Sequence, residues 1–302
     1  MTPELAAMLP TRDGVGPSVI ALPPGAWSHV IDYLEFRFPS ISRAEIADRM
    51  HRGDVRDERG AFLLPDATYR AQQKLYYYRR IDDEPRIPFD ETIVFEDELI
   101  LVADKPHFLP VTPGGRYLQE TLLVRLKRKT AIDTLAPLHR IDRETAGLVV
   151  FTKQPHTRGI YAALFAQKIV SKVYEAIAPW RDDLSLPMTY RSRVVGSDHF
   201  MRMQEEAGEA NAQTHIALIE KIGPLARYRL HPVTGKRHQL RVQMAALGLP
   251  ILNDQIYPRH VSSEELDGDY STPLQLLAKA IGFCDPVTGD QRAFESRFVL
   301  LR

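Results

Sequence analysis

The chain has 302 residues, of which 44% are hydrophobic and 26% are charged. This is the composition of an ordinary folded globular protein, and the length suits one main domain with a small appendage. Lysine plus arginine and aspartate plus glutamate each number 39, so the net charge is zero. Net charge therefore gives no support to a nucleic-acid partner, which must be argued from local patches.

The sequence offers no membrane or secretory segment. No stretch reaches the roughly 18 apolar residues that a membrane helix needs, and the start MTPELAAMLPTRDGVGP lacks a basic region followed by an apolar one. The single cysteine, Cys284, cannot form an internal disulfide, fits a reducing compartment, and is expected to be a small buried side chain. We therefore predict a cytoplasmic protein without a membrane partner.

The first 80 residues predict a lead-in and a small α/β unit. Residues 1–25 are rich in proline and glycine, which predicts a loosely ordered lead-in. In residues 26–80, an apolar helical face ends at Pro39, and Ser42 with Glu45 then forms the pattern of a capping box. The sequence FPSISRAEIADRMHRGDV resembles the S4 RNA-binding fold, which presents basic residues on a helix pair. The matching residues are Arg43, Arg49, His51 and Arg52. The alternative is a solvated helical hairpin with scattered charge.

Residues 81–91 are polar, contain two prolines and predict a linker to a domain spanning 92–302. In this domain, pairs of apolar runs separated by turn residues predict three hairpins, and two further strands and two helices follow from periodicity. The hairpins are 92–95 with 99–103, 213–220 with 226–231, and 275–283 with 292–300; the strands are 147–152 and 172–178; the helices are 156–169 and 240–247. Many hairpins with few helices predict an α+β fold with a largely antiparallel mixed sheet and flanking helices.

The segment LHRIDRETAGLVV, residues 138–150, is a polar loop that leads into an apolar strand, a setting in which scaffolds present reactive groups. Arg140 and Arg143 flank Asp142, and nearby cations favour the ionised carboxylate. That form is the one needed by a nucleophile or a general base. Without further context, such an aspartate is more often part of a structural ion pair.

Two further segments carry candidate site residues. In HPVTGKRHQLRVQM, a turn at 234–235 precedes Lys236, Arg237 and His238 at a helix start, an arrangement that attracts phosphate. Arg241 lies at the edge of the buried helix face, within reach of a carboxylate. In SKVYEA, Tyr174 lies on a strand and is either a core aromatic or a pocket residue. Additional basic residues expected to contact RNA are Arg125, Lys127, Arg128 and Lys129.

Taken together, the motifs resemble those of the RluA-type RNA pseudouridine synthases. HRIDRETAGLVVFTK, SKVYEAI, HPVTGKRHQLRVQMAALGLPIL and LLAKAIGFCDPVTGDQRAFES occur in the family's order, and ADKPHFLPVTPGG resembles its lysine–proline segment. The resemblance covers about residues 90–302. Departures from the family's usual residues are Ile141, Ala146, Lys236, Arg237 and Asn253, and none removes a reactive group. Asn253 replaces a usual glycine and bears on a local turn.

The resemblance implies an isomerase that converts uridine in rRNA or tRNA to pseudouridine without a cofactor or metal. It implies that Asp142 is the catalytic carboxylate, that Tyr174 packs on the target base, and that Arg241 pairs with the aspartate. Arg140 would help to displace the target nucleotide. The remaining residues expected to contact RNA in these motifs are His139, Arg143, Lys236, Arg237 and His238. No protein partner is implied, so we expect a monomer.

Such an isomerisation breaks the N1–C1′ bond, turns the base and forms a C5–C1′ bond, and a stacked base must be flipped out first. A carboxylate beside C1′ can stabilise positive charge, attack the carbon or remove a proton from C2′, and the sequence does not choose among these. Three other functions were weighed: an RNA-binding protein on an idle scaffold, a protein kinase suggested by HRID, and a glycosidase with two carboxylates. The joint presence of Asp142, Tyr174 and Arg241 argues against the idle scaffold. The kinase lacks a glycine-rich phosphate loop and an Asn at the required offset, and its Asp would be one residue late. The glycosidase needs a second carboxylate in a comparable setting, and the sequence singles out none.

Overall fold

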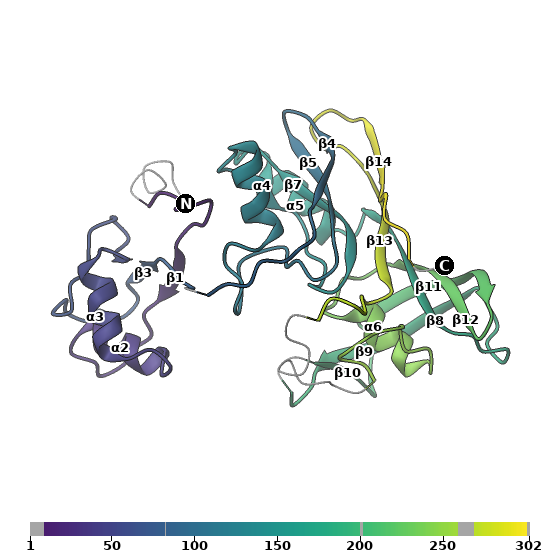
Figure 1. Cartoon of the computed structure of the whole chain (residues 1–302), viewed down its shortest axis with the longest axis horizontal. Coiled ribbons are helices and arrows are strands. Elements are labelled where there is room, and N and C mark those ends of the chain that lie inside the picture. Colours follow the sequence, from purple (N-terminus) through teal and green to yellow (C-terminus); the bar gives the residue numbers. More distant parts are fainter. Residues whose placement is uncertain (1–8, 82, 200–201, 259–268, 301–302) are drawn as a thin grey trace. The chain divides into compact units, whose positions relative to one another are not determined.

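The computed structural model describes residues 9–81, 83–199, 202–258 and 269–300 (Figure 1). The chain divides into two compact units. The first contains the chain up to Pro85 together with Pro113–Gln119 and Lys127–Asp133, and the second contains the rest. The division after Pro85 falls within the predicted linker. The predicted unit 26–80 does not include the two later segments of the first unit, which fall within the range 92–302 predicted for the other domain.

The first unit combines a small antiparallel sheet with two helices. Its strands follow the order β1-β3-β2 and its helices are α2 and α3. The bounds are β1 Ser18–Ala21, β2 Val55–Arg56, β3 Lys74–Tyr77, α2 Val30–Arg37 and α3 Arg43–His51. Apolar side chains of both helices and all three strands share one core.

The prediction of a loosely ordered lead-in over 1–25 is wrong for residues 9–25. β1 pairs with β3 along its whole length, and Leu9 and Leu22 are buried. The physical reason is that Ile20 and Leu22 belong to the core of the unit, so the surrounding prolines and glycines mark the ends of a short strand and not a loose tail. Residues 1–8 lie outside the described part of the chain.

The arginines suggested by the S4 resemblance form ion pairs with neighbouring acidic residues. Ser42 Oγ accepts the Glu45 N–H at 3.2 Å, which is the predicted helix cap. Glu45, however, pairs with Arg49 instead of reaching back. Arg43 binds Asp32 and Glu35, both at 2.8 Å, and Arg52 binds Asp48. These ion pairs offset the positive charge that α3 would present, so RNA binding by this unit stays a prediction.

The second unit is built on one mixed sheet (Figure 1). Within the described residues it has eleven strands, nine of them in the order β10-β9-β11-β12-β8-β13-β7-β5-β4, with β14 beside β13 and β6 beside β7. Their bounds are β4 Thr92–Glu96, β5 Ile100–Lys105, β6 Ala136–Pro137, β7 Ala146–Thr152, β8 Ser171–Pro179, β9 Met188–Gly196, β10 Met203–Glu206, β11 Ala212–Ile222, β12 Leu225–Pro232, β13 Leu276–Cys284 and β14 Gln291–Glu295. The pairing of β13 with β7 is parallel and the other pairings are antiparallel. This confirms the predicted α+β fold.

Helices cover the two halves of this sheet. α5 (Arg158–Ala166) buries Tyr161 and Leu164 in one core with β5 and β7, and α6 (Gln239–Ala246) buries apolar residues in a second core with β8 and β12. α4 (Leu122–Thr130) was not predicted, nor were β9 and β10. Cys284 is exposed at the end of β13, contrary to expectation, because alternate residues of that strand face outward there. None of the helices in the described residues is long and apolar enough to cross a membrane.

The register at the centre of the sheet brings the predicted motifs together. Ala278 of β13 lies opposite Gly147 of β7 on one side and Tyr174 of β8 on the other. Tyr174 in turn lies opposite Leu230, just before the second motif. Gly147 has φ +113°, and a Cβ there would lie 2.3 Å from the Ala278 carbonyl oxygen, so only glycine allows this approach. The loop that precedes β7 therefore opens beside Tyr174.

Candidate active site

A cavity of about 680 Å³ lies where these segments meet. Its size is in the usual range for a pocket that accepts a small molecule or a single nucleotide. The loop before β7, strand β8, and α6 with the segment that precedes it all line the cavity, and they contribute Asp142, Tyr174 and Arg241 respectively. The three residues predicted to act together, although distant in the chain, share one opening.

Asp142 is partly exposed to the cavity, with 26% of its side chain accessible, and α6 holds its carboxylate. Arg241 Nη1 donates to Oδ2 at 3.2 Å, and His238 Nε2 lies 3.8 Å from Oδ1. The sequence-based expectation was that Arg140 and Arg143 would supply the neighbouring charge. Instead, Arg143 Nε donates to Glu144 at 2.9 Å, and the cation that binds Asp142 is Arg241 of α6, the partner that the family resemblance implied.

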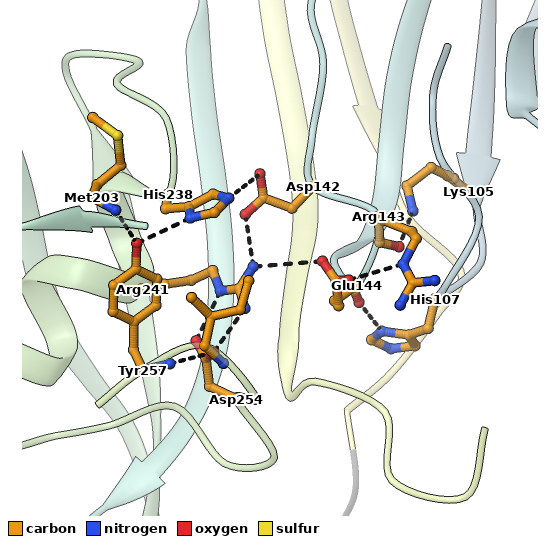
Figure 2. Close-up of polar contacts among 11 residues, drawn as sticks. Lys105, His107, Asp142, Arg143, Glu144, Met203, His238, Arg241, Asp254 and Tyr257 are labelled. Atoms are coloured by element: carbon orange, nitrogen blue, oxygen red, sulfur yellow. Dashed lines mark hydrogen bonds and ion pairs between the residues drawn. The ribbon is translucent and has the colours of Figure 1, made fainter. Parts of the chain in front are cut away.

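Arg241 is held in place by three carboxylates (Figure 2). Its side chain is 1% exposed, and Nε and Nη2 donate to the two oxygens of Asp254 at 2.8 and 2.7 Å. This leaves Nη1 for Asp142 and for Glu144, which lies at 3.6 Å. Burial alone would lower the pKa of Arg241, but these carboxylates raise it, so the guanidinium stays charged. The cation that orients Asp142 is thus fixed before any substrate arrives.

Asp254 is a site residue that the sequence analysis missed. It is fully buried, and besides binding Arg241 it accepts the backbone N–H groups of Ile256 and Tyr257 at 2.9 and 3.0 Å. The preceding Asn253 has φ +63°, a left-handed conformation that asparagine tolerates, so the turn survives without the usual glycine. The only signal in the sequence was an aspartate directly after a turn residue, which is too common to be specific.

Tyr174 presents its ring to the cavity, and its hydroxyl has no hydrogen-bond partner among the described residues. Burial, and secondarily the charge of Asp142, raise the pKa of the Tyr174 hydroxyl. The phenol therefore remains protonated at neutral pH. The ring is available for stacking, and the hydroxyl can donate a hydrogen bond.

Comparison with known proteins decides the family. Residues 99–246 match the family described as RNA pseudouridylate synthase. The tRNA pseudouridine(31) synthase of Saccharomyces cerevisiae is 30% identical over 275 residues, covering 77% of this chain and 67% of that protein. The chain belongs to the RNA pseudouridine synthase family. Its members are isomerases that act on RNA.

Further relatives support the same family and fold. The ribosomal large subunit pseudouridine synthase D of Zymomonas mobilis is 28% identical over 277 residues. The alignment covers 85% of this chain and 86% of the Zymomonas protein. The solved structure of human RNA pseudouridylate synthase domain containing 1 aligns with a TM-score of 0.57 at 21% identity, covering 72% of this chain and 88% of the human one. The human structure supports the fold alone.

The other residues expected to contact RNA fall into two groups. Arg140 and Lys236 are exposed at the cavity of this synthase, and their side chains have no ion-pair partner among the described residues. Arg237 is also exposed there. His139 differs, because its Nε2 accepts the Val150 N–H at 3.2 Å. Burial, then the charge of Lys172, lowers the pKa of His139 to about 3, so this ring is neutral and supports the loop, and its contact with RNA stays a prediction.

Arg125, which was also expected to contact RNA, is committed to partners within the protein. Its side chain is 10% exposed and forms ion pairs with Glu91 and Glu120, and it donates to the carbonyl oxygens of Ile87 and Phe89. An arginine committed to so many partners holds the chain together and has little capacity left for a phosphate. Sequence alone could not show this, because all of its partners except Glu120 lie more than 30 residues away.

Lys105 braces the loop that carries Asp142 (Figure 2). Its side chain is completely buried, and Nζ donates to the carbonyl oxygens of Pro106 and Arg143 at 2.9 and 3.0 Å. His107 Nδ1 lies 2.6 Å from the Glu144 carbonyl oxygen. The lysine–proline segment therefore supports the backbone just after Asp142. Burial, opposed by the charges of Glu144 and Asp142, lowers the pKa of Lys105 to about 7.

A pH-dependent stability follows from Lys105. Its pKa is about 7 in the folded state and 10.5 when exposed, so between these values the unfolded chain binds more protons. The free energy of unfolding should then rise with pH across this window, by up to about 1.4 kcal/mol per pH unit. Lys105→Met should remove that slope in denaturant unfolding between pH 7 and 10. Lys74→Met, at an exposed lysine, is the control; equal slopes for all three proteins would refute the role of Lys105.

Proposed function

We propose that this enzyme isomerises specific uridines of structured rRNA or tRNA, flipping the target nucleotide into the cavity and using Asp142 as the catalytic carboxylate. The observation that supports this proposal most strongly is the convergence of Asp142, Tyr174 and Arg241 on one cavity. An aspartate sealed from solvent would have no access to a ribose. Here the carboxylate is partly exposed and its cation is buried, as the chemistry requires.

The residues divide the work as follows. As the N1–C1′ bond breaks, C1′ becomes electron-poor. The Asp142 carboxylate is the negative group placed to stabilise that charge, attack C1′ or remove a proton from C2′. Arg241 holds that carboxylate in a fixed orientation through its Oδ2 atom. The Tyr174 ring stacks on the extruded uracil, while Arg140 fills the space left in the RNA stack. Lys236 and Arg237, at the start of α6, bind backbone phosphates.

The substrate class is proposed from the relatives. One relative is named for a tRNA position and another for the large ribosomal subunit. Mapping pseudouridines in total RNA from cells with and without the gene should reveal at least one rRNA or tRNA uridine that depends on it. The purified protein should then modify that uridine in an unmodified transcript. Absence of any dependent site would refute the proposal, and release of free uracil would instead indicate a glycosidase.

The remaining expectations stay proposals. A cytoplasmic location is supported by the single cysteine, which does not depend on an oxidising compartment. Because the chain is neutral overall, we propose a small electrostatic footprint that rests on the basic residues around the cavity. Binding of RNA should therefore weaken as salt increases.

Tyr174 variants separate the ring from the hydroxyl. Tyr174→Phe keeps the aromatic face and should bind the target RNA as the wild type does. Tyr174→Ala removes the stacking, typically worth about 1–3 kcal/mol per base, and should bind correspondingly more weakly. Filter binding with the unmodified transcript checks both. If Phe and Ala bound equally, Tyr174 would not contact the base. A loss of rate in the Phe variant, at unchanged binding, would assign proton transfer to the hydroxyl.

A further inference from the structure

His238 occupies an unusual position at the start of α6. It is the residue directly before the helix, its φ is +52°, and its side chain is 8% exposed. A non-glycine residue in this left-handed region costs roughly 1 kcal/mol or more, and asparagine and glycine occupy it more readily. The contacts of the two ring nitrogens of His238 give a reason for a buried histidine at this strained position.

A hydrogen-bonded chain fixes one side of the imidazole. The Met203 N–H donates to the Tyr257 hydroxyl oxygen at 2.7 Å, and that oxygen lies 3.0 Å from His238 Nδ1 (Figure 2). Burial raises the pKa of Tyr257, so it remains a phenol with one proton to donate. A phenol oxygen that accepts from Met203 can still donate its own proton, and Nδ1 is the acceptor within reach. The tautomer of neutral His238 then carries its proton on Nε2.

The other side of the imidazole faces the catalytic loop. His238 Nε2 lies 3.8 Å from Asp142 Oδ1, while Arg241 binds the opposite oxygen, Oδ2. The distance is longer than a formed hydrogen bond, as is common for catalytic contacts before substrate closes the site. The two carboxylate oxygens thus have separate partners on α6 and at its start. One partner is a cation and the other is a directional N–H group.

The neutral state of His238 follows from its surroundings. Burial lowers its pKa, Arg241 and Arg237 act in the same direction, and Asp142 and Glu144 oppose them. The groups that face the ring are therefore Tyr257 on one edge and Asp142 on the other, with these three further charges around them. A neutral donor can orient Asp142 without adding a second full positive charge beside it. A second positive charge beside Asp142 would weaken the interaction of the carboxylate with an electron-poor C1′.

We propose that His238 is a positioning residue for Asp142: Tyr257 fixes its tautomer, and its Nε2–H holds Oδ1 of the carboxylate during turnover. The proposal rests on the proposed function, since it assigns His238 a role through the aspartate. Tyr257 has a matching role as the residue that sets the imidazole proton. Its ring is flanked by the Arg202 and Arg241 guanidinium groups, 5.3 and 5.7 Å from its centroid, which limits its movement.

Two substitutions at His238 distinguish positioning from a structural role. In His238→Gln the side-chain amide nitrogen reaches the place of Nε2 and can still donate to Asp142, whereas the bond to Tyr257 is lost. In His238→Asn the amide reaches only the place of Nδ1, so it keeps Tyr257 as a partner and suits the left-handed backbone. If His238 positions Asp142, the His238→Gln variant should have the higher single-turnover rate. If His238 has only a structural role, the His238→Asn variant should have the higher rate.

The single-turnover rate on the unmodified transcript found by the mapping experiment is the readout. Because a hydrogen bond to a charged group is worth about 1.5–3 kcal/mol, His238→Asn should be slower than His238→Gln by at least roughly tenfold. Transcript affinity should differ little between the two. Equal rates, or a faster Asn variant, would overturn the proposal.

A measurement without turnover keeps the test informative if either variant folds poorly. In wild-type protein labelled with ¹⁵N-histidine, the His238 resonances, assigned by their loss in His238→Gln, should show a proton on Nε2 and none on Nδ1. Tyr257→Phe should mix the two tautomers. A wild-type proton on Nδ1 would overturn the inference. Activity remaining in an Asp142→Asn enzyme would instead refute the proposed function, while the tautomer result would stand on its own.

Discussion

Asp142→Asn should abolish pseudouridine formation while leaving RNA binding nearly intact. The amide has the shape of the carboxylate but no charge, so it cannot stabilise, attack or deprotonate the sugar as C1′ becomes electron-poor. We expect turnover to fall by at least about 1,000-fold, as for other residues whose charge or nucleophilicity is used in the chemical step. Pseudouridine formed in the unmodified transcript measures turnover, and filter binding of the same transcript measures affinity.

The expected separation of rate and affinity has a structural basis. Asp142 is held by Arg241 at one oxygen, and an asparagine oxygen can accept that same bond. Loss of one charge at a partly exposed site should therefore not unfold the loop. Asp198→Asn, at an exposed aspartate, is the matched control and should keep full turnover. Residual catalysis above about one-thousandth of the wild-type rate in Asp142→Asn would remove the aspartate from its role.

The parts of the fold that sequence predicted best are those with strong local patterns. The hairpin of β11 and β12, the strand β7 and the helix α6 each have clear periodicity or turn signals, and all were predicted. β9, MTYRSRVVG, and the edge strand β10, MQEE, were missed because polar and charged residues make up much of both, a composition that also suits an exposed loop. Edge strands gain much of their stability from a neighbour, which the local sequence does not reveal.

The reactive residues were predictable and their supporting residues were not. Asp142, Tyr174 and Arg241 lie in motifs whose order resembles a family. Asp254 and Tyr257 act only because the chain returns to α6 after a turn, and their neighbours in sequence carry no sign of it. Arg125 shows the same limit in reverse: a basic residue that reads as an RNA contact is committed to Glu91 and Glu120.

Arg241 is the residue whose loss should cost both activity and stability. In Arg241→Met the buried Asp254 loses its bidentate partner, and Asp142 loses its orienting cation. Breaking a buried ion pair by removing one partner typically costs about 3–5 kcal/mol. Turnover should be lost together with this free energy of unfolding. Denaturant unfolding and pseudouridine formation check the two effects, with Arg193→Ala at an exposed arginine as the control.

A double variant separates the two effects. Adding Asp254→Asn to Arg241→Met removes the buried carboxyl group that has lost its partner, so part of the lost stability should return, because replacing both members of a buried pair is far less costly than removing one. Turnover should not return, since nothing then orients Asp142. If activity recovered along with stability, Arg241 would act only through the fold. If stability did not recover, the unpaired Asp254 carboxylate would not be the cause of the loss.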